Sequence, residues 1–402
     1  MLYKYSNICA KKEMIKLRYL FFILLIFFIN ECYSQNKYSI SAFGQYGYVF
    51  PTDKFLDGTY TGNPINTIQA YSIRYNIQTN GSKPWHQLYN YPSFGIGIYT
   101  ANFQEKQHLG LPIAIYAFSS VPLIRKGSFT LNNDFALGLA YFPKHWSVDN
   151  LANVSIGSHL NCYVEEGLSL NFSFSKKLEL SLGFTLSHFS NGATQRPNWA
   201  IYTASSRIGL RYNIYDAHDI YIFQPKPELK KGYDLIFSAF GGYYNELREL
   251  GQYEPKDERR YVRRNFYAFG LNTSLLKQIS YKNSFGIGIN LGYDDKADTK
   301  FEVYGSTILS TTAPFEKRLN ITTFITYEYK MQDFSVLVDA GYYIYRTKSQ
   351  NSTPNFFQRI GFRYKIIDNI FASVAIRASK FRLAHHIEWS LGYRLQHNQK
   401  QN

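Results

Sequence analysis

Cysteine is nearly absent from this chain of 402 residues, which holds only three. Cys9 and Cys32 lie in an N-terminal segment that we expect to be removed, so the mature chain keeps only Cys162. A single cysteine cannot form an internal disulfide, which excludes a secreted disulfide-rich scaffold. No zinc-ligand spacing occurs either, and we expect neither a metal nor an organic cofactor.

Long apolar runs are also missing, apart from one near the N-terminus. Tyr19–Ile29 is an apolar stretch of about eleven residues, too short for a membrane-spanning helix. A positively charged segment precedes it, with Lys11, Lys12, Lys16 and Arg18. Small residues at Cys32 and Ser34 fit a cleavage site, so we expect residues 1–34 to be a signal peptide. A lipoprotein signal at Cys32 is less favoured, because Asn30-Glu31 is a poor lead-in.

Aromatic residues, in contrast, make up 18% of the chain, although its mean hydropathy is −0.29. This combination is unusual for a soluble enzyme and typical of a structure with one apolar face, one polar face and aromatic girdles. The formal net charge of +15 falls to about +12 without residues 1–34, which hold five Lys or Arg and two Glu. We expect no nucleic-acid partner for an exported chain that lacks a recognition motif. The expected partners are anionic surfaces such as phosphorylated outer-membrane lipids.

Alternation of apolar with small or polar residues recurs along the rest of the chain, in segments of about ten to fourteen residues. Clear examples are Phe94–Ile98, Phe129–Tyr141, Leu178–Leu186, Ile208–Tyr212, Phe285–Tyr293 and Trp389–Leu395. In a transmembrane barrel the apolar side chains face lipid and the others face the lumen. A soluble β-sandwich alternates too, but its outward face is the polar one. The pattern therefore predicts an all-β fold, a transmembrane antiparallel β-barrel.

The links between these segments predict a topology. Tight turns are expected on the periplasmic side at 125–127, 175–177 and 367–369. Longer polar links are expected on the extracellular side, near 51–66, 143–155, 191–198, 244–264, 294–318 and 345–355. This reading gives roughly sixteen strands, an even number as in bacterial barrels.

Internal repeats indicate that the barrel arose by duplication. Two segments recur about 190 residues later, Ser41–Gly44 as Ser238–Gly241 and Ser93–Ile98 as Ser284–Ile289. A third match, of Arg207–Tyr212 with Arg359–Tyr364, has a different spacing and indicates only a common strand sequence.

The repeats divide the chain into an eight-stranded unit and its copy. We expect the halves at residues 35–222 and 232–396, with a linker at 223–231 and a polar tail at 397–402. One sixteen-stranded barrel and two tandem eight-stranded barrels are both compatible with this division.

A chemically suggestive pair ends the strand predicted for Leu178–Ser190. Its even-numbered residues from Leu178 to Leu186 are apolar, and side chains at i and i+2 share a face. His188 and Ser190 therefore continue the lipid-facing row, where polar groups have little reason to lie unless they act there. An imidazole beside a hydroxyl is the minimum for an activated nucleophile, with a third group to hold the ring. The simpler interpretation is a His and a Ser that contact lipid headgroups, since H-x-S is a weak motif.

The residues around this pair resemble a known family. His188-Phe189-Ser190-Asn191-Gly192, followed by Pro197-Asn198, resembles the signature of the PagL family of lipid A 3-O-deacylases. Trp85–Pro92 resembles the long Bacteroidetes-type members, and the resemblance covers about residues 37–214. It implies an acyloxyacyl hydrolase-like barrel in the outer membrane of a Gram-negative bacterium, with lipid A or lipopolysaccharide as its substrate.

The resemblance also implies roles for individual residues. Ser190 would be the nucleophile and His188 the general base, with Asn191 and the backbone around Gly192 as oxyanion donors. The family's acid lies fourteen residues after the His, where this chain has Tyr202. A phenol accepts a hydrogen bond from imidazole but supplies no charge at neutral pH.

Glu166 is the candidate to replace that acid. It shares the parity of the outward residues in Leu160–Phe172, and the hairpin turn predicts a register in which it opposes Leu186. In that register Glu166 is a diagonal neighbour of His188 on the same face. The alternative is a β-bulge at Glu165–Gly167 that turns both carboxylates into the lumen.

Other polar groups have simpler interpretations. His386 and Glu388 alternate with the lipid-facing Ile387 and Trp389, so we expect both to point into the lumen. A cluster of arginines on a predicted extracellular loop is either solvated or in contact with lipid A phosphates: Arg259, Arg260, Arg263 and Arg264.

The sequence predicts an outer-membrane esterase that removes an ester-linked acyl chain from lipid A by Ser/His nucleophilic catalysis on the lipid-facing wall. The alternative is a non-catalytic barrel, porin-like or structural, which the Tyr202 departure supports. A lumen lined by Arg and Lys and free of plugs would favour the pore, whereas a tightly filled lumen would favour the enzyme.

Overall fold

The computed structural model describes residues 37–214, 221–223, 232–297, 299–304, 307–311, 313–347, 354–381 and 383–398. The predicted signal peptide and nearly all of the predicted linker lie outside these ranges. Among the described residues, no helix combines the length and apolar character needed to cross a membrane.

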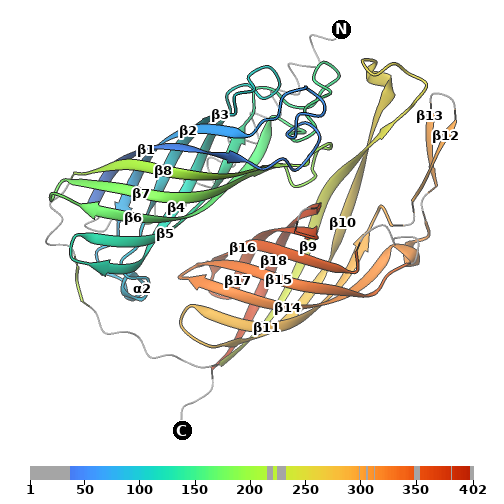
Figure 1. Cartoon of the computed structure of the whole chain (residues 1–402). Coiled ribbons are helices and arrows are strands. Elements are labelled where there is room, and N and C mark those ends of the chain that lie inside the picture. The colour runs from blue at the N-terminus through green and yellow to red at the C-terminus, as the bar shows by residue number, and fades with distance from the viewer. Residues whose placement is uncertain are drawn as a thin grey trace.

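The first barrel is a closed ring of eight antiparallel strands (Figure 1). Its strands are β1 (Lys37–Val49), β2 (Thr67–Gln78), β3 (Ser93–Asn102), β4 (Ile113–Lys126), β5 (Phe129–Tyr141), β6 (Leu160–Ser173), β7 (Leu178–Ser190) and β8 (Ile201–Asn213). A short helix, α2 (Pro84–Leu88), lies between β2 and β3. The ring closes because β8 pairs with β1, from Asn213 opposite Ser39 to Thr203 opposite Val49.

The second barrel is a separate closed ring, also of eight strands. Its strands are β9 (Gly232–Glu249), β10 (Tyr261–Gln278), β11 (Asn283–Asp294), β14 (Leu319–Met331), β15 (Phe334–Tyr345), β16 (Phe356–Ile367), β17 (Ile370–Ser379) and β18 (Leu383–Asn398). The hairpin of β12 (Lys300–Tyr304) and β13 (Thr307–Thr311) stands outside the ring in the link from β11 to β14. Two single-turn 3-10 helices also lie between strands of this barrel: η1 (Glu258–Arg260) between β9 and β10, and η2 (Phe315–Arg318) just before β14.

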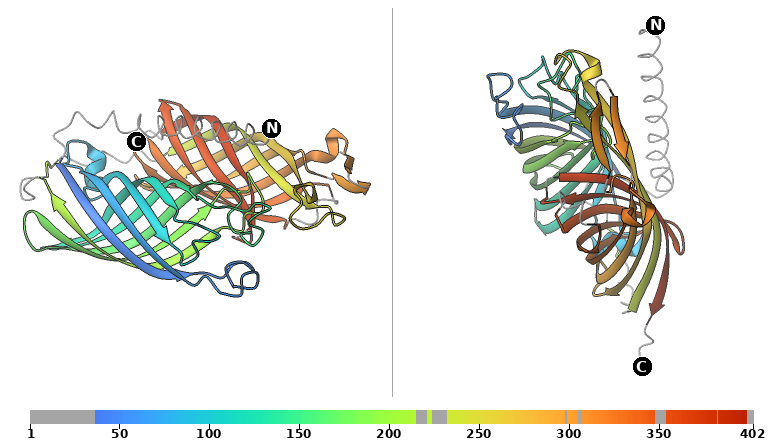
Figure 2. Two further views of the ribbon diagram at one scale, coloured as in Figure 1. Left: turned by 90° about the horizontal axis from the view of Figure 1, so that it is seen from above. Right: turned by 90° about the vertical axis from the view of Figure 1, so that its right-hand side faces the viewer.

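Of the two arrangements compatible with the sequence, the single sixteen-stranded barrel is therefore wrong and the two eight-stranded barrels are confirmed, with the predicted sixteen barrel strands in all. Each set of eight strands closes by pairing its own first and last strands, β1 with β8 and β9 with β18, and no strand of one set pairs with a strand of the other among the described residues. The repeated segments occupy equivalent places, in the first strand of each ring (β1 and β9) and in the third (β3 and β11). Two further views show the same two barrels, the first coloured blue to green and the second yellow to red (Figure 2).

Two predicted links are partly strand. β9 and β10 extend through both ends of the predicted link 244–264, so only about ten residues separate them. The link 294–318 contains the β12–β13 hairpin. The polar residues that suggested loops lie in the strand ends next to these links, where the apolar alternation of the barrel wall stops. The predicted tail is also shorter, because β18 runs to Asn398.

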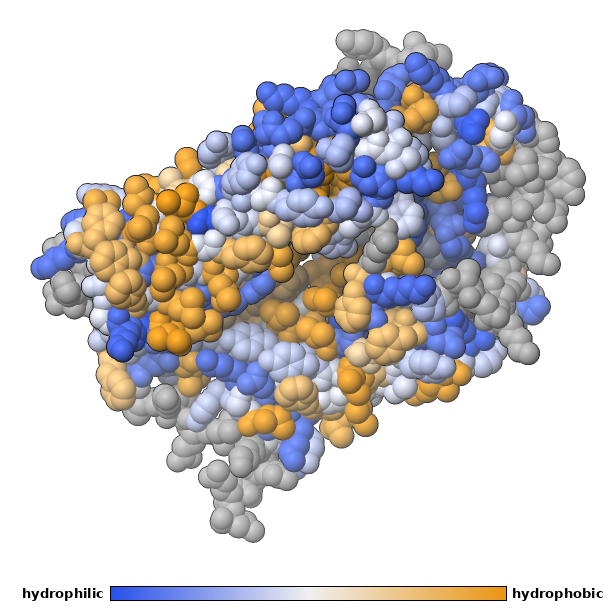
Figure 3. All heavy atoms as spheres, viewed as in Figure 1, coloured by the Kyte–Doolittle hydropathy of each residue, from blue (hydrophilic) through white to orange (hydrophobic). Residues whose placement is uncertain are grey.

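The two faces of each wall differ as the alternation predicts. Outward residues are large, apolar and exposed, such as Leu182, Phe184 and Ile208 in the first barrel and Ile287 and Leu391 in the second. Hydrophobic residues gather over the strands in the space-filling view, and hydrophilic ones over the long links (Figure 3). The inner faces carry buried polar and charged side chains instead.

Charged networks fill both lumens. In the first, Glu165 accepts hydrogen bonds from Arg74 (2.9 Å) and Arg207 (3.2 Å), and Arg207 also pairs with Asp134. In the second, His386 and Glu388 point inward as predicted, and Glu388 binds Arg359 (3.0 Å) and Arg377 (2.8 Å). All these side chains are buried, so each lumen holds a network of charged groups.

Candidate active site

His188 and Ser190 lie on the outer face of the first barrel at the end of β7. The even-numbered residues before them, Leu182, Phe184 and Leu186, are exposed, while the odd-numbered residues of the strand face the lumen. Unlike the rest of its row, Ser190 is only 4% exposed, and His188 is half-buried. The pair therefore faces outward but lies under cover, beneath the link that follows β7.

Two groups from that link hold the Ser190 hydroxyl. Its Oγ accepts a hydrogen bond from the backbone N–H of Gly192 (3.1 Å) and another from Nδ2 of Asn198 (2.8 Å). Gly192 has φ +63°, and a Cβ there would lie 2.6 Å from Cγ1 of Ile387, so a larger residue does not fit without movement. The hydroxyl is held from two sides by donors that depend on the shape of the link.

The two predicted oxyanion donors, Asn191 and Gly192, direct their hydrogen bonds to different places. Gly192 directs its backbone N–H at the Ser190 hydroxyl. The side-chain amide of Asn191 instead donates to the hydroxyl of Ser158, just before β6 (3.0 Å), and to the carbonyl of Gln195 in the link after β7 (2.8 Å). The backbone N–H of Asn191 points to Oδ1 of Asn198 at 3.4 Å. Asn198 takes the place beside Ser190, and the sequence analysis did not single it out, although it stands in the matched motif.

Tyr202 is the direct cross-strand partner of His188, on β8. The two ring centroids are 4.6 Å apart, with planes inclined by 43°. The position fourteen residues after the His thus lies where an acid would reach the imidazole, and a phenol ring fills it. Nδ1 of His188 is buried and has no hydrogen-bond partner among the described residues.

Glu166 is exposed on the outer face, in the predicted register. It opposes Leu186, with Val164 opposite His188, and the pairing of β6 with both neighbours runs without a shift. The predicted alternative of a β-bulge that turns both carboxylates inward is therefore wrong: Glu165 alone faces the lumen. The carboxylate of Glu166 accepts a hydrogen bond from Asn133 on β5, on the side away from His188.

The arginine cluster is engaged within the protein at three of its positions. Arg259 pairs with Asp257 (2.6 Å), Arg260 with Glu249 (3.3 Å), and the guanidinium of Arg263 lies over the ring of Trp146 (5.0 Å). These contacts favour a structural role for much of the cluster.

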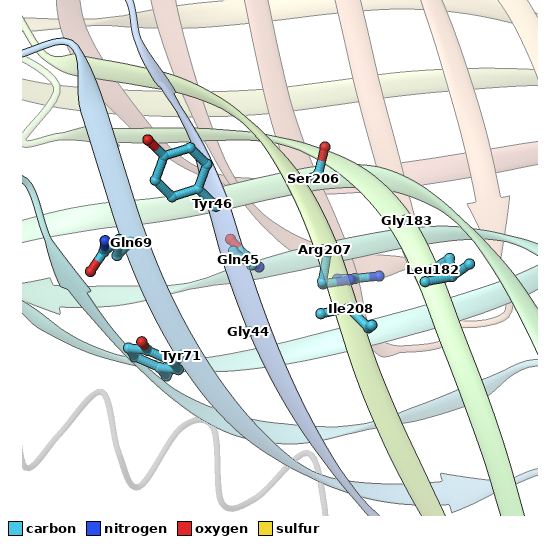
Figure 4. A pocket seen from close by; sticks show the side chains of 10 residues that line it. All are labelled: Gly44, Gln45, Tyr46, Gln69, Tyr71, Leu182, Gly183, Ser206, Arg207 and Ile208. Atoms are coloured by element: carbon cyan, nitrogen blue, oxygen red, sulfur yellow. The ribbon is translucent and has the colours of Figure 1, made fainter.

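A hollow of about 540 Å³ lies on the outer wall of the first barrel, on the same face as the pair. Its rim carries outward side chains from β1, β2, β7 and β8, and its floor is open because Gly44 and Ser206 are small (Figure 4). Ser206 lies four residues along β8 from Tyr202, and only the small Ala204 stands between them on that row. The hollow thus reaches Ser206 on β8, on the same outer face as the pair.

Comparison with known families accounts for both barrels. Residues 69–211 match the family described as lipid A 3-O-deacylase (PagL), and residues 232–398 match the family described as acyloxyacyl hydrolase, C-terminal domain. The chain belongs to the PagL family of lipid A 3-O-deacylases. The PagL match contains the pair and Tyr202, and the C-terminal match spans the second barrel.

Solved structures match this member of the PagL family at low sequence identity. The outer membrane enzyme PagL is 17% identical and covers 42% of this chain and 97% of its own, with a TM-score of 0.26. Neisserial surface protein A is 9% identical over 44% of this chain and 97% of its own, with a TM-score of 0.28. The Pseudomonas putida toluene transporter TodX is 10% identical over 91% of each chain, with a TM-score of 0.18. Among curated proteins, none matches the chain significantly.

Proposed function

We propose that this protein is an outer-membrane esterase that removes an ester-linked acyl chain from lipid A. The observation that carries the proposal is the placement of Ser190, which lies on the outward face beside His188 with its hydroxyl held by two donors. A site on the outer wall meets an acyl ester without extracting the lipid from the membrane. The family match supplies the substrate class.

In the proposed reaction Ser190 attacks the ester carbonyl while His188 takes the hydroxyl proton. The carbonyl carbon forms a bond to Oγ, and the bond to the sugar oxygen breaks as His188 returns the proton to that oxygen. Water then attacks the acyl-enzyme with His188 again as base, which releases the fatty acid and restores Ser190. The backbone N–H of Gly192, which lies beside the Ser190 hydroxyl, and Asn191 are the proposed donors to the developing oxyanion.

The hollow on the outer wall supports a lipid substrate. Gly44 and Ser206 are smaller than the tyrosine, leucine and isoleucine side chains that also line it, so an acyl chain that lies in it buries more surface than one on a flat wall. We propose that such a chain continues along β8, with its reacting carbonyl near Tyr202 and Ser190.

We propose Glu166 as the acid that supports His188, and replacing Glu166 tests this role. Glu166→Gln removes the charge that would stabilise the imidazolium of His188 once the side chain turns away from Asn133. We expect the rate of fatty-acid release to fall about tenfold or more. An unchanged rate in Glu166→Gln, together with an inactive Ser190→Ala, would eliminate Glu166 as the acid.

Restoring the family's acid gives the opposite test. In Tyr202→Glu a carboxylate stands directly opposite His188, where it accepts the imidazole N–H and holds the ring. We expect kcat to rise about 10- to 100-fold, and the same change should rescue Glu166→Gln. Tyr202→Gln, which is similar in shape but uncharged, is the control. A rise in Tyr202→Gln as large as in Tyr202→Glu would show that steric relief, and not charge, limits the wild-type protein.

Mass spectrometry of lipid A tests the proposed function as a whole. Lipid A from cells that make the protein should lack one acyl mass that is present in lipid A from cells without it. Identical lipid A in the two preparations, with the protein folded in the outer membrane, would refute the proposal. The filled lumens already speak against the pore alternative.

A further inference from the structure

In the second barrel, the pairing that closes the ring, between the first strand β9 and the last strand β18, does not reach the end of β9. We call this unpaired stretch the seam. The pairing of β18 with β9 stops at Ile387 opposite Tyr243, whereas β9 continues to Glu249 and pairs there with β10 alone. The other edge of β9 therefore presents backbone groups that need partners, because an unpaired buried N–H costs free energy comparable to a lost hydrogen bond.

The link that covers Ser190 fills this seam. The backbone N–H of Asn245 donates to the carbonyl of Ala193 (3.2 Å), as an adjacent strand would. The side chain of Ala193 packs in a buried cluster with Tyr244, Phe266 and Ala268 of the second barrel. A segment of the first barrel thus replaces β18 at the mouth of the second.

The side chain of Asn245 makes two more bonds to the same segment. Its Nδ2 donates to the carbonyl of Thr194 (3.0 Å), and its Oδ1 accepts from the backbone N–H of Arg196 (2.8 Å). The guanidinium of Arg196 in turn donates to the carbonyl of Ala384 on β18 (3.0 Å). Asn245 is only 4% exposed, so these bonds are shielded from water.

The segment that Asn245 holds lies between the two donors to Ser190. Gly192 stands just before it and Asn198 just after it, and both direct an N–H at the hydroxyl. Gly192 is also in tight contact with Ile387 of β18. A cleft of about 300 Å³ beside Asn198 is lined from both barrels, by Arg196, Trp199, Arg248 and Leu383 among others.

We propose that the second barrel is a working part of the hydrolytic site and that Asn245 is its positioning residue. Asn245 contacts neither Ser190 nor His188. It acts by holding the link 193–196 in the shape that aims Gly192 and Asn198 at the nucleophile. The expected effect of Asn245 on catalysis rests on the proposed function, whereas its effect on the order of residues 193–196 does not.

The test compares Asn245→Ala with Asn265→Ala in the full-length protein in lipid A-containing vesicles. Asn265 is the cross-strand neighbour of Asn245 on β10, is exposed, and binds Tyr243 (2.9 Å) instead of the link. We expect Asn245→Ala to lower kcat about 10- to 100-fold with KM changed less than about twofold, because a small displacement of aligned groups costs this much. Hydrogen–deuterium exchange of peptides spanning 191–198 should rise in Asn245→Ala only.

The two readouts separate the possible failures. If the wild-type protein deacylates lipid A and Asn245→Ala does so equally fast, the positioning role is overturned while the proposed function stands. If exchange in the link is the same in all three proteins, the role is overturned whatever the activity. If the wild-type protein does not deacylate at all, the proposed function fails, and the exchange data alone decide whether Asn245 orders the link.

Discussion

Replacing Ser190 by alanine is expected to reduce the release of fatty acid from lipid A by at least about 10³-fold, because no other group in the site replaces the attacking oxygen. The fold should survive the change. Ser190 is small, and the two donors to its hydroxyl, Gly192 and Asn198, lose one hydrogen bond each. The measurement is the initial rate of fatty-acid release from lipid A in vesicles, with the folded fraction checked by circular dichroism.

Ser119→Ala is the matched control for this prediction. Ser119 is a half-buried serine on the outward row of β4 and does not line the hollow on the outer wall. Its loss should leave the rate within about twofold. If Ser190→Ala kept a substantial part of the wild-type rate, Ser190 would not be the nucleophile. If His188→Ala added to the defect of Ser190→Ala, the two would not act as a unit, since residues of one catalytic unit are strongly non-additive.

The second large effect concerns the first lumen, where Glu165→Gln should lower the free energy of unfolding by about 3–5 kcal/mol. Glu165 accepts hydrogen bonds from Arg74, Arg207, Gln45 (3.0 Å) and Tyr163 (2.9 Å). An uncharged amide leaves two buried guanidiniums with Asp134 as their remaining carboxylate. Such an uncompensated buried charge is strongly destabilising.

Urea unfolding in vesicles would measure this loss, and the neighbouring residue supplies the control. Glu166→Gln makes the same chemical change one position along β6, but on the exposed outer face. We expect it to change the stability by less than about 1 kcal/mol. Equal effects of the two substitutions would mean that the lumen network contributes little. The same comparison keeps the catalytic test of Glu166 free of a folding artefact.

Much of the site could be predicted from alternation alone. Side chains of a strand alternate between its two faces, so every second residue lies on the same face. The apolar even-numbered residues from Leu178 to Leu186 face outward, and His188 and Ser190 therefore do so too. The tight hairpin of β6 and β7 set the register that places Glu166 opposite Leu186. Parity also placed Tyr202 on the outer face and His386 in the second lumen. These are local properties of short segments, which is why the sequence carries them.

The partners of those side chains could not be predicted in the same way. Glu166 binds Asn133 on β5, and the Ser190 hydroxyl is held by Asn198 across a link of several residues. Parity gives the face on which a side chain lies, but not which of several neighbours on that face it turns to. That choice depends on side-chain rotamers and on the course of a link without a repeating pattern.

By itself, the sequence determined that this chain forms sixteen barrel strands with apolar outer faces, that it is duplicated, and that a His and a Ser end one outward row. Only the tertiary structure decided that the strands close as two rings, because closure depends on pairing between residues more than 150 positions apart, such as Ser39 with Asn213. It also decided that the link after Ser190 completes the seam of the second ring. Nothing in the local pattern of either segment records that contact, since Asn245 and Ala193 belong to different barrels and lie far apart in the sequence.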